Sequence, residues 1–179
     1  MQRHQVFVWT VLIATGVATA AAQMRPAEPA ARGVVPTILP TGFGAAVDRD
    51  VERARTATIR FKLAENALAA NYEAAANCIA NPPHGAMGYH FKKDSLYDAK
   101  LEVEKPEILV YEKTSDGSFK LNGVEYIVPI AAWKSEEAPT IMGQKLKRAD
   151  SLGIWYLHVW IWEPSPSGIF ADWNPRVKC

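Results

Sequence analysis

The sequence has few cysteines, almost no net charge and, past its first residues, no long apolar run. It contains two cysteines among 179 residues, with 20 basic and 19 acidic residues. A chain with so small a net charge lacks the excess of basic residues that is typical of proteins that bind nucleic acid or anionic lipid. It also lacks a phosphate-binding glycine-rich loop, a nucleophile elbow, zinc-finger spacing and a calcium loop. These absences argue against nucleotide-dependent enzymes, common hydrolases and a nucleic-acid partner.

The one long apolar run lies at the start of the chain and predicts export. Residues 1–22 combine a cationic start at Arg3, an apolar run over 6–18 and small residues at 20–22, the layout of a secretory signal peptide. The run is shorter than the roughly 20 residues that span a bilayer. We therefore expect cleavage, a secreted or periplasmic protein and no membrane span in the mature chain. The alternative is an uncleaved membrane anchor.

The two cysteines are Cys78 and Cys179. In an exported chain they have one possible intramolecular pairing, so we predict a disulfide between them. It would close a loop of about 100 residues and contribute roughly 4 to 5 kcal/mol on the chain-entropy model. The alternative is a reactive Cys78 thiol that works with His84 or His90.

Two segments precede the predicted sheet. Residues 23–44 hold four prolines and three glycines without periodicity, which predicts a flexible linker before a single domain at 45–179. From residue 45 to residue 79, apolar side chains recur at spacings of three and four, which predicts one long helix. Pro82 and Pro83 follow this stretch, and proline cannot continue a helix.

Short apolar segments with turn residues between them predict an antiparallel sheet of about four strands. The predicted strands are 84–91, 108–111, 119–128 and 156–162, the second and third joined as a hairpin through Thr114-Ser115-Asp116-Gly117. We therefore expect an α+β fold, with the long N-terminal helix packed on this sheet and a C-terminal tail tied by the disulfide.

The last of these strands is apolar on both faces, which is typical of a central strand covered on both sides. Because successive side chains alternate between faces, one face would carry a histidine among aromatic rings and the other aliphatic residues only. The first face holds Tyr156, His158, Trp160 and Trp162, and the second holds Leu157, Val159 and Ile161.

His90, Glu125 and His158 form the candidate metal site. They lie on three predicted strands that could be neighbours, and a carboxylate among apolar residues must be paired, protonated or metal-bound. Two imidazoles and a carboxylate suit a transition metal such as iron, zinc or copper, with coordination positions left for water or substrate. A metal-dependent enzyme that uses these three residues is therefore the alternative to the ligand binding described below. A metal-free histidine–glutamate acid/base pair is an alternative reading.

The aromatic residues favour a different class of function. Tyr156, Trp160 and Trp162 could line a pocket for a small apolar or aromatic ligand, oriented by His90, Glu125 and His158. If these rings only fill a core, the protein would be a structural or interaction module of the cell envelope. We favour ligand binding over an enzymatic activity, and the sequence leaves the oligomeric state open.

Several short motifs stand out along the second half of the chain. They are Gly-Ala-Met-Gly-Tyr-His at 85–90, Pro-Glu-Ile-Leu-Val-Tyr-Glu at 106–112, Gly-Val-Glu-Tyr at 123–126, Leu-His-Val-Trp at 157–160 and the tail at 166–179. Together they resemble a family of uncharacterised exported bacterial proteins. The resemblance covers roughly residues 72–179 and implies export and a disulfide-bonded tail, but no reaction. Pro164-Ser165 stands where relatives carry a His-Asn pair, so a metal site that uses that histidine is not implied for this chain.

Overall fold

The computed structural model describes residues 37–75 and 77–179. The predicted signal peptide at 1–22 and most of the predicted linker lie outside the described residues. The linker's last residues, 37–44, have no regular secondary structure. Ile38 and Leu39 nevertheless pack against the main core, so this part of the predicted linker belongs to the folded domain.

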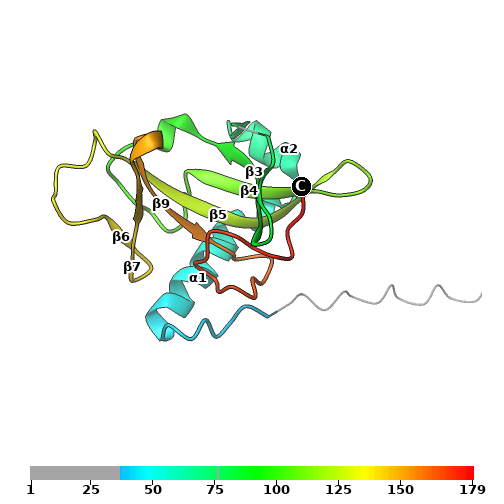
Figure 1. The fold of residues 1–179 in the computed structure, drawn as a ribbon, viewed down its shortest axis with the longest axis horizontal. Helices are drawn as coiled ribbons and strands as arrows, with labels where there is room; N and C mark the ends of the chain where they lie inside the picture. The colour runs from blue at the N-terminus through cyan, green and yellow to red at the C-terminus, as the bar shows by residue number, and fades with distance from the viewer. Residues whose placement is uncertain (1–36, 76) are drawn as a thin grey trace, which may run out of the picture. The chain divides into compact units, whose positions relative to one another are not determined.

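The structure is built on a mostly antiparallel sheet of seven strands (Figure 1). The order across the sheet is β1-β3-β4-β5-β9-β8, and β2 also pairs with β3. A separate hairpin is formed by β6 (Thr140–Ile141) and β7 (Gln144–Lys145). The strands of the main sheet are β1 (Glu73–Ala74), β2 (Ile79–Asn81), β3 (Gly85–Lys92), β4 (Ile108–Lys113), β5 (Phe119–Pro129), β8 (Lys147–Ala149) and β9 (Ile154–Val159).

The helical part is much shorter than predicted. α1 (Ala45–Thr58) continues as the 3-10 turn η1 (Ile59–Lys62), and the separate α2 (Ala64–Ala69) has only six residues. The remaining 3-10 turns are η2 (Asp94–Leu96) and η3 (Asp150–Leu152). The predicted architecture, one long helix over 45–79 on about four strands, is therefore wrong in both its helix and its strand number.

The prediction failed because the three- and four-residue spacing of apolar side chains in the sequence continues beyond the end of the helix. Val51, Ala54, Thr58 and Phe61 are buried at helical spacings, as predicted. The chain then turns out of the helix at Leu63, which has an extended backbone. Tyr72 is again buried, but it reaches the core from the segment that leads into β1. The helical pattern of burial therefore ends with η1: Leu68 and Ile79 continue the apolar spacing in the sequence but are 53% and 37% exposed, which spacing alone does not reveal.

The two faces of the sheet carry two different cores. On the first face, α1 packs against side chains such as Leu109, Val124 and Leu157. The second face carries a smaller cluster that includes Val110, Ile127 and Trp160, and it is completed by residues of the C-terminal tail such as Val177. The second core also receives the buried polar side chains described below.

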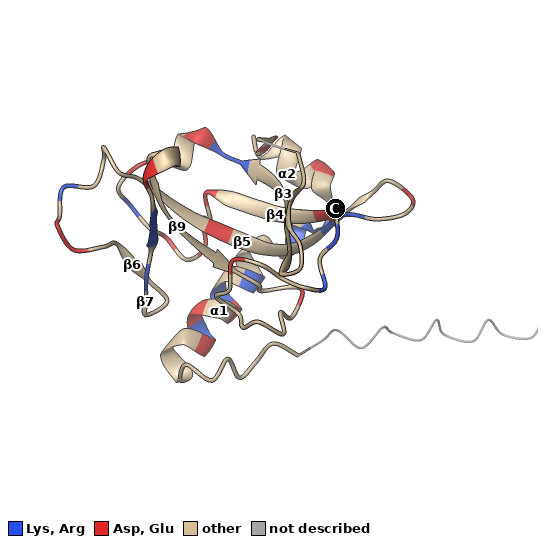
Figure 2. Ribbon diagram, in the orientation of Figure 1, with Lys and Arg blue, Asp and Glu red and all other residues tan. Residues whose placement is uncertain are grey.

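The predicted disulfide is confirmed. Cys78 and Cys179 are bonded, with their Cα atoms 5.4 Å apart, and neither cysteine is free to act as a reactive thiol. The bond is consistent with an extracellular or otherwise oxidising compartment. Within the described residues, no helix combines the length and apolar character needed to cross a bilayer. Charged residues of both signs are spread over helices, strands and loops (Figure 2).

Candidate metal centre

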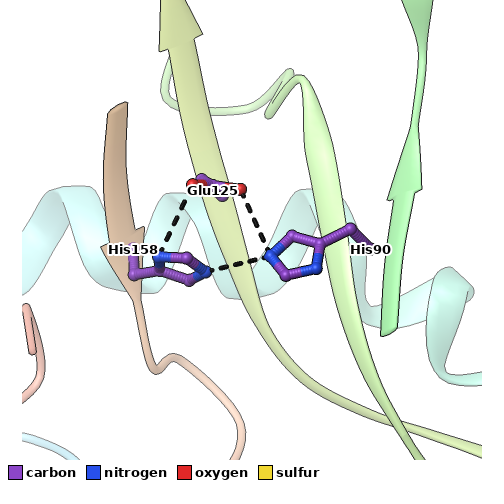
Figure 3. A group of neighbouring side chains, drawn as sticks. All are labelled: His90, Glu125 and His158. Carbon is purple, nitrogen blue, oxygen red and sulfur yellow. Dashed lines mark hydrogen bonds and ion pairs between the residues drawn. The ribbon is translucent and has the colours of Figure 1, made fainter. Parts of the chain in front are cut away.

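His90, Glu125 and His158 come from three strands of the main sheet. Glu125 on β5 lies directly opposite His158 on β9. His90 on β3 pairs with Val110 on β4, and Val110 pairs in turn with Gly123 on β5, two residues from Glu125. Because side chains two residues apart on a strand share a face, this register places all three side chains on the second face of the sheet. They meet there, as Figure 3 shows.

The three side chains form a closed triangle of polar atoms (Figure 3). Nε2 of His90 lies 3.3 Å from Nε2 of His158. The carboxylate of Glu125 spans both rings, with Oε2 3.5 Å from His90 Nε2 and Oε1 3.5 Å from His158 Nδ1. These contacts are longer than the 2.7–3.2 Å typical of good hydrogen bonds to nitrogen. The triangle is therefore close-packed but poorly hydrogen-bonded.

Burial makes that poor hydrogen bonding costly. The exposed fractions of the His90, Glu125 and His158 side chains are 8%, 7% and 2%. Nδ1 of His90 and Nδ1 of His158 are buried atoms without a hydrogen-bond partner in the part of the chain that the structure describes. Leaving a buried polar atom unpaired costs about 1–3 kcal/mol. Of these two atoms, Nδ1 of His158 faces the Glu125 carboxylate, whereas Nδ1 of His90 lies on the side of its ring away from the triangle (Figure 3).

The same burial shifts all three pKa values toward the neutral forms. It lowers the pKa of His90 to about 4. For His158, burial is again the main cause, and with the nearby imidazole of His90 it holds the pKa well below its usual value. Burial, helped by the negative charge of Asp172, raises the pKa of Glu125 to about 8. At neutral pH the histidines are therefore neutral, the form in which imidazole binds metals.

The donor geometry fits a metal ion. One ligand atom from each of the three residues can be chosen so that all lie within 4.8 Å of one another. Donors about 2.1 Å from a tetrahedral or octahedral metal lie roughly 3.0–3.4 Å apart. The separations of 3.3 Å and 3.5 Å around His90 Nε2 are close to that range. This buried group could therefore hold a metal after only small side-chain movements.

Two of the three aromatic residues predicted to belong to the site lie beside it. The ring of Trp160 stacks on His158 at 5.9 Å with an interplanar angle of 16°, and Tyr156 meets the same imidazole edge-on. Gly123 allows β9 to approach β5 closely at this point, because a Cβ atom there would come within 2.6 Å of the Val159 carbonyl oxygen and 3.4 Å of the Trp160 ring.

Trp162 does not belong to this group, so the predicted shared face is wrong at this residue. β9 ends at Val159, and the chain beyond it no longer alternates as a strand. Trp162 packs in the first core, where its Nε1 donates to Thr58 and its ring contacts Arg55 and Lys62.

Sequence reasoning missed Asp172 and Tyr97. The Tyr156 hydroxyl donates to Asp172 Oδ2 at 3.4 Å, and Lys147 pairs with the other oxygen of Asp172. Tyr97 packs against the second core, and the charge of Glu125 adds to the burial that raises its pKa. Tyr97 directly follows the three-residue turn η2, and Asp172 lies in an irregular segment, so no periodicity in the sequence places either residue.

Two surface cavities border the second face without containing the triangle. One, of about 250 Å³, is lined by Trp160 together with residues 37–41 and 164–169. The other, of about 370 Å³, lies beneath the disulfide and reaches Ala86 and Val177. Neither is lined by His90, Glu125 or His158.

Comparison of the chain with protein-family models, curated proteins and solved structures finds no match.

Proposed function

We propose that this protein is an exported metalloprotein that binds one divalent transition-metal ion through His90, Glu125 and His158. The observation that carries the proposal is the convergence of two imidazoles and a carboxylate, from three strands of one sheet, within 4.8 Å. Their burial and the long contacts between their polar atoms support it, because a metal ion would compensate donor atoms that the protein leaves poorly hydrogen-bonded.

The ligand set favours iron, zinc or copper over magnesium or calcium, which prefer all-oxygen ligands. Three protein ligands leave at least one coordination position for water or a small substrate. A metal bound in this way can polarise a carbonyl group or activate a water molecule, so a metal-dependent reaction is compatible with the site. The neighbouring rings of Tyr156 and Trp160 limit the space around His158 to small molecules.

Binding of an apolar or aromatic ligand, the function favoured by the sequence, has less support from the geometry. Trp162 faces the other core, and Trp160 is itself buried with its Nε1 donated to the Ala171 carbonyl. The cavity that borders Trp160 does not reach the two histidines. We therefore place a metal ahead of an organic ligand.

Elemental analysis tests the proposal directly. The full chain would be expressed, exported and purified from the periplasm without chelator or affinity metal. Near-stoichiometric metal should be present in the wild type and in His84→Ala, whose imidazole is exposed and outside the site. It should be lost from His90→Ala and His158→Ala. Absence of metal from the wild type, together with no uptake of added Zn²⁺, Fe²⁺ or Cu²⁺, would refute the proposal and direct attention to co-purified small molecules.

A further inference from the structure

The C-terminal segment, residues 169–179, covers the second face of the sheet at the candidate metal centre. It has almost no regular structure, yet Asn174 and Val177 are nearly inaccessible to solvent. Asn174 is joined to Ala86 of β3 by two backbone hydrogen bonds, of 3.2 Å and 3.1 Å. Val177 packs in the same core as Val110 and Trp160. We call residues 169–179 the cover.

The cover is attached to the aromatic residues that touch His158. Trp160 Nε1 donates to the Ala171 carbonyl at 2.6 Å, and the Trp160 backbone N–H donates to the Ile169 carbonyl. Tyr156 contacts Asp172 from the same side. Because Trp160 stacks on His158 and Tyr156 meets its edge, movement of the cover would change the surroundings of the imidazole directly.

The disulfide fixes the far end of the cover. Cys179 is bonded to Cys78, which immediately precedes β2, and β2 pairs with the strand that carries His90. The last residues are also held by the burial of Val177, by a hydrogen bond from the Lys178 N–H to the Glu112 side chain, which is only 16% exposed, and by a 3.8 Å ion pair between Arg176 and Glu163. The cavity of about 370 Å³ already runs beneath this end, between Gly85, Val177 and Cys179. Release of the last residues would extend it toward the second core.

We infer that the cover closes the His90–Glu125–His158 site and that the Cys78–Cys179 disulfide is its latch, so that thiol–disulfide exchange controls entry and loss of the metal. The inference rests on the proposed function. In the opening step a dithiol thiolate attacks one sulfur of the disulfide, which forms a mixed disulfide and releases the first cysteine thiolate; the second thiol of the reagent then attacks its own sulfur in the mixed disulfide and releases the second cysteine thiolate. The protein gains two electrons and two protons as two thiols, and the reagent becomes a disulfide.

The first test measures how fast bound Zn²⁺ passes to an excess of a chromophoric chelator. The zinc-loaded wild type, expressed from the full chain and exported, would be compared with the zinc-loaded variant Cys78→Ser/Cys179→Ser. The variant lacks the disulfide, so no dithiol reagent, which would itself bind zinc, has to be added. We expect release from the double variant to be at least about tenfold faster, because local opening governs exchange at a buried site. An unchanged rate in a folded, loaded double variant would overturn the inference.

A matched pair of valines separates opening of the cover from general loss of stability. Val177 in the cover is 1% exposed and Val51 in α1 is 0% exposed, and they pack against opposite faces of the sheet. Val177→Ala, with its disulfide intact, should accelerate zinc release several-fold, whereas Val51→Ala should stay within about twofold of the wild type. Equal acceleration by both substitutions would mean that global unfolding, and not the cover, limits release.

A second readout does not depend on metal binding. In metal-free protein, carbethoxylation of His90 and His158 by diethyl pyrocarbonate can be followed by mass spectrometry, with exposed His84 as an internal reference. The two buried histidines should react faster in the double serine variant while the rate at His84 stays the same. If the wild type binds no metal, the proposed function fails, but this labelling still decides whether the cover opens. Equal labelling with and without the disulfide would contradict the latch.

Discussion

Nε2 of His90 and Nε2 of His158 lie 3.3 Å apart although two strands, β4 and β5, separate the strands that carry them. Neighbouring strands are about 4.8 Å apart, so the two backbones are separated by roughly 14 Å. The imidazoles therefore reach toward each other along the surface of the sheet, over Val110 and Gly123. Two neutral rings at this distance also need different tautomers, one nitrogen donating and the other accepting. This arrangement brings together two nitrogen atoms that could bind a metal, without a local sequence motif.

The first prediction concerns the pH dependence of metal affinity. Burial raises the pKa of Glu125 to about 8, so a metal must displace a proton from this carboxyl group at neutral pH. The pKa of His90 is lowered to about 4, so that imidazole releases none. Zn²⁺ affinity should therefore increase about tenfold per pH unit between pH 6 and 8 and change less above it. Competition titrations with a chromophoric chelator would measure this slope, and a flat profile would contradict it.

The second prediction compares two buried carboxyl groups. Glu107 also has a pKa raised by burial to about 8, but its Oε2 accepts a hydrogen bond from the Ile127 N–H and it is not part of the triangle. Glu125→Gln should weaken Zn²⁺ binding by at least about 100-fold, because it removes one of three ligands. Glu107→Gln should leave the affinity within about threefold of the wild type. Calorimetry on both variants would measure this, and equal losses would indicate a general structural effect.

The sheet and the site could be predicted in part because both depend on side chains alternating between the two faces of a strand. Strands β3, β4, β5 and most of β9 were indicated by apolar runs with turn residues between them, and the disulfide followed from having only two cysteines. Alternation also placed His158 with Tyr156 and Trp160. The strands and the shared face of β9 depend on residues close together in the sequence, whereas the disulfide joins residues 101 positions apart and was predictable only because the chain has no other cysteine.

The remaining features depend on where the chain changes direction. The helix ends near Lys62 although burial continues to Tyr72, and β9 ends before Trp162, which therefore packs in the opposite core. β8 is short and charged, so it carries no apolar signal. The cover and Asp172 are irregular, and their position is set by hydrogen bonds to residues distant in sequence. No periodic pattern encodes such contacts.

The third prediction concerns the stability of the metal-free protein. The folded-state pKa of Glu125 is raised above its unfolded value, so its contribution to stability is greatest below about pH 4.5 and is lost as pH rises toward 8. Glu125→Gln removes this dependence. The stability of the variant relative to the wild type should therefore increase from pH 5 to 8, by up to about 1.4 kcal/mol per pH unit. Urea unfolding in the presence of chelator would measure it; a pH-independent difference would show that Glu125 remains ionised when buried.

The fourth prediction concerns the disulfide as a stabilising element. Cys78 and Cys179 are separated by 101 positions, so their bond restricts a large part of the unfolded chain. Cys78→Ser/Cys179→Ser should lower the free energy of unfolding by about 2–5 kcal/mol. Urea denaturation of the exported wild type and variant at equal pH would give the difference. A change below about 0.5 kcal/mol would mean that the bond does not restrict the unfolded chain as the entropy model requires.

The fifth prediction tests the packing of Trp160 beside the candidate metal centre. A Cβ atom at Gly123 would lie 2.6 Å from the Val159 carbonyl oxygen and 3.4 Å from the Trp160 ring, so Gly123→Ala must displace the backbone of β9 or the indole. Overpacking of this kind costs about 1–3 kcal/mol. Because Trp160 stacks on His158, the substitution should also weaken Zn²⁺ binding, which a purely distant loss of stability would not do. Calorimetric titration under conditions where the variant is fully folded separates the two effects. Unchanged affinity in a destabilised but folded variant would show that Trp160 does not position His158.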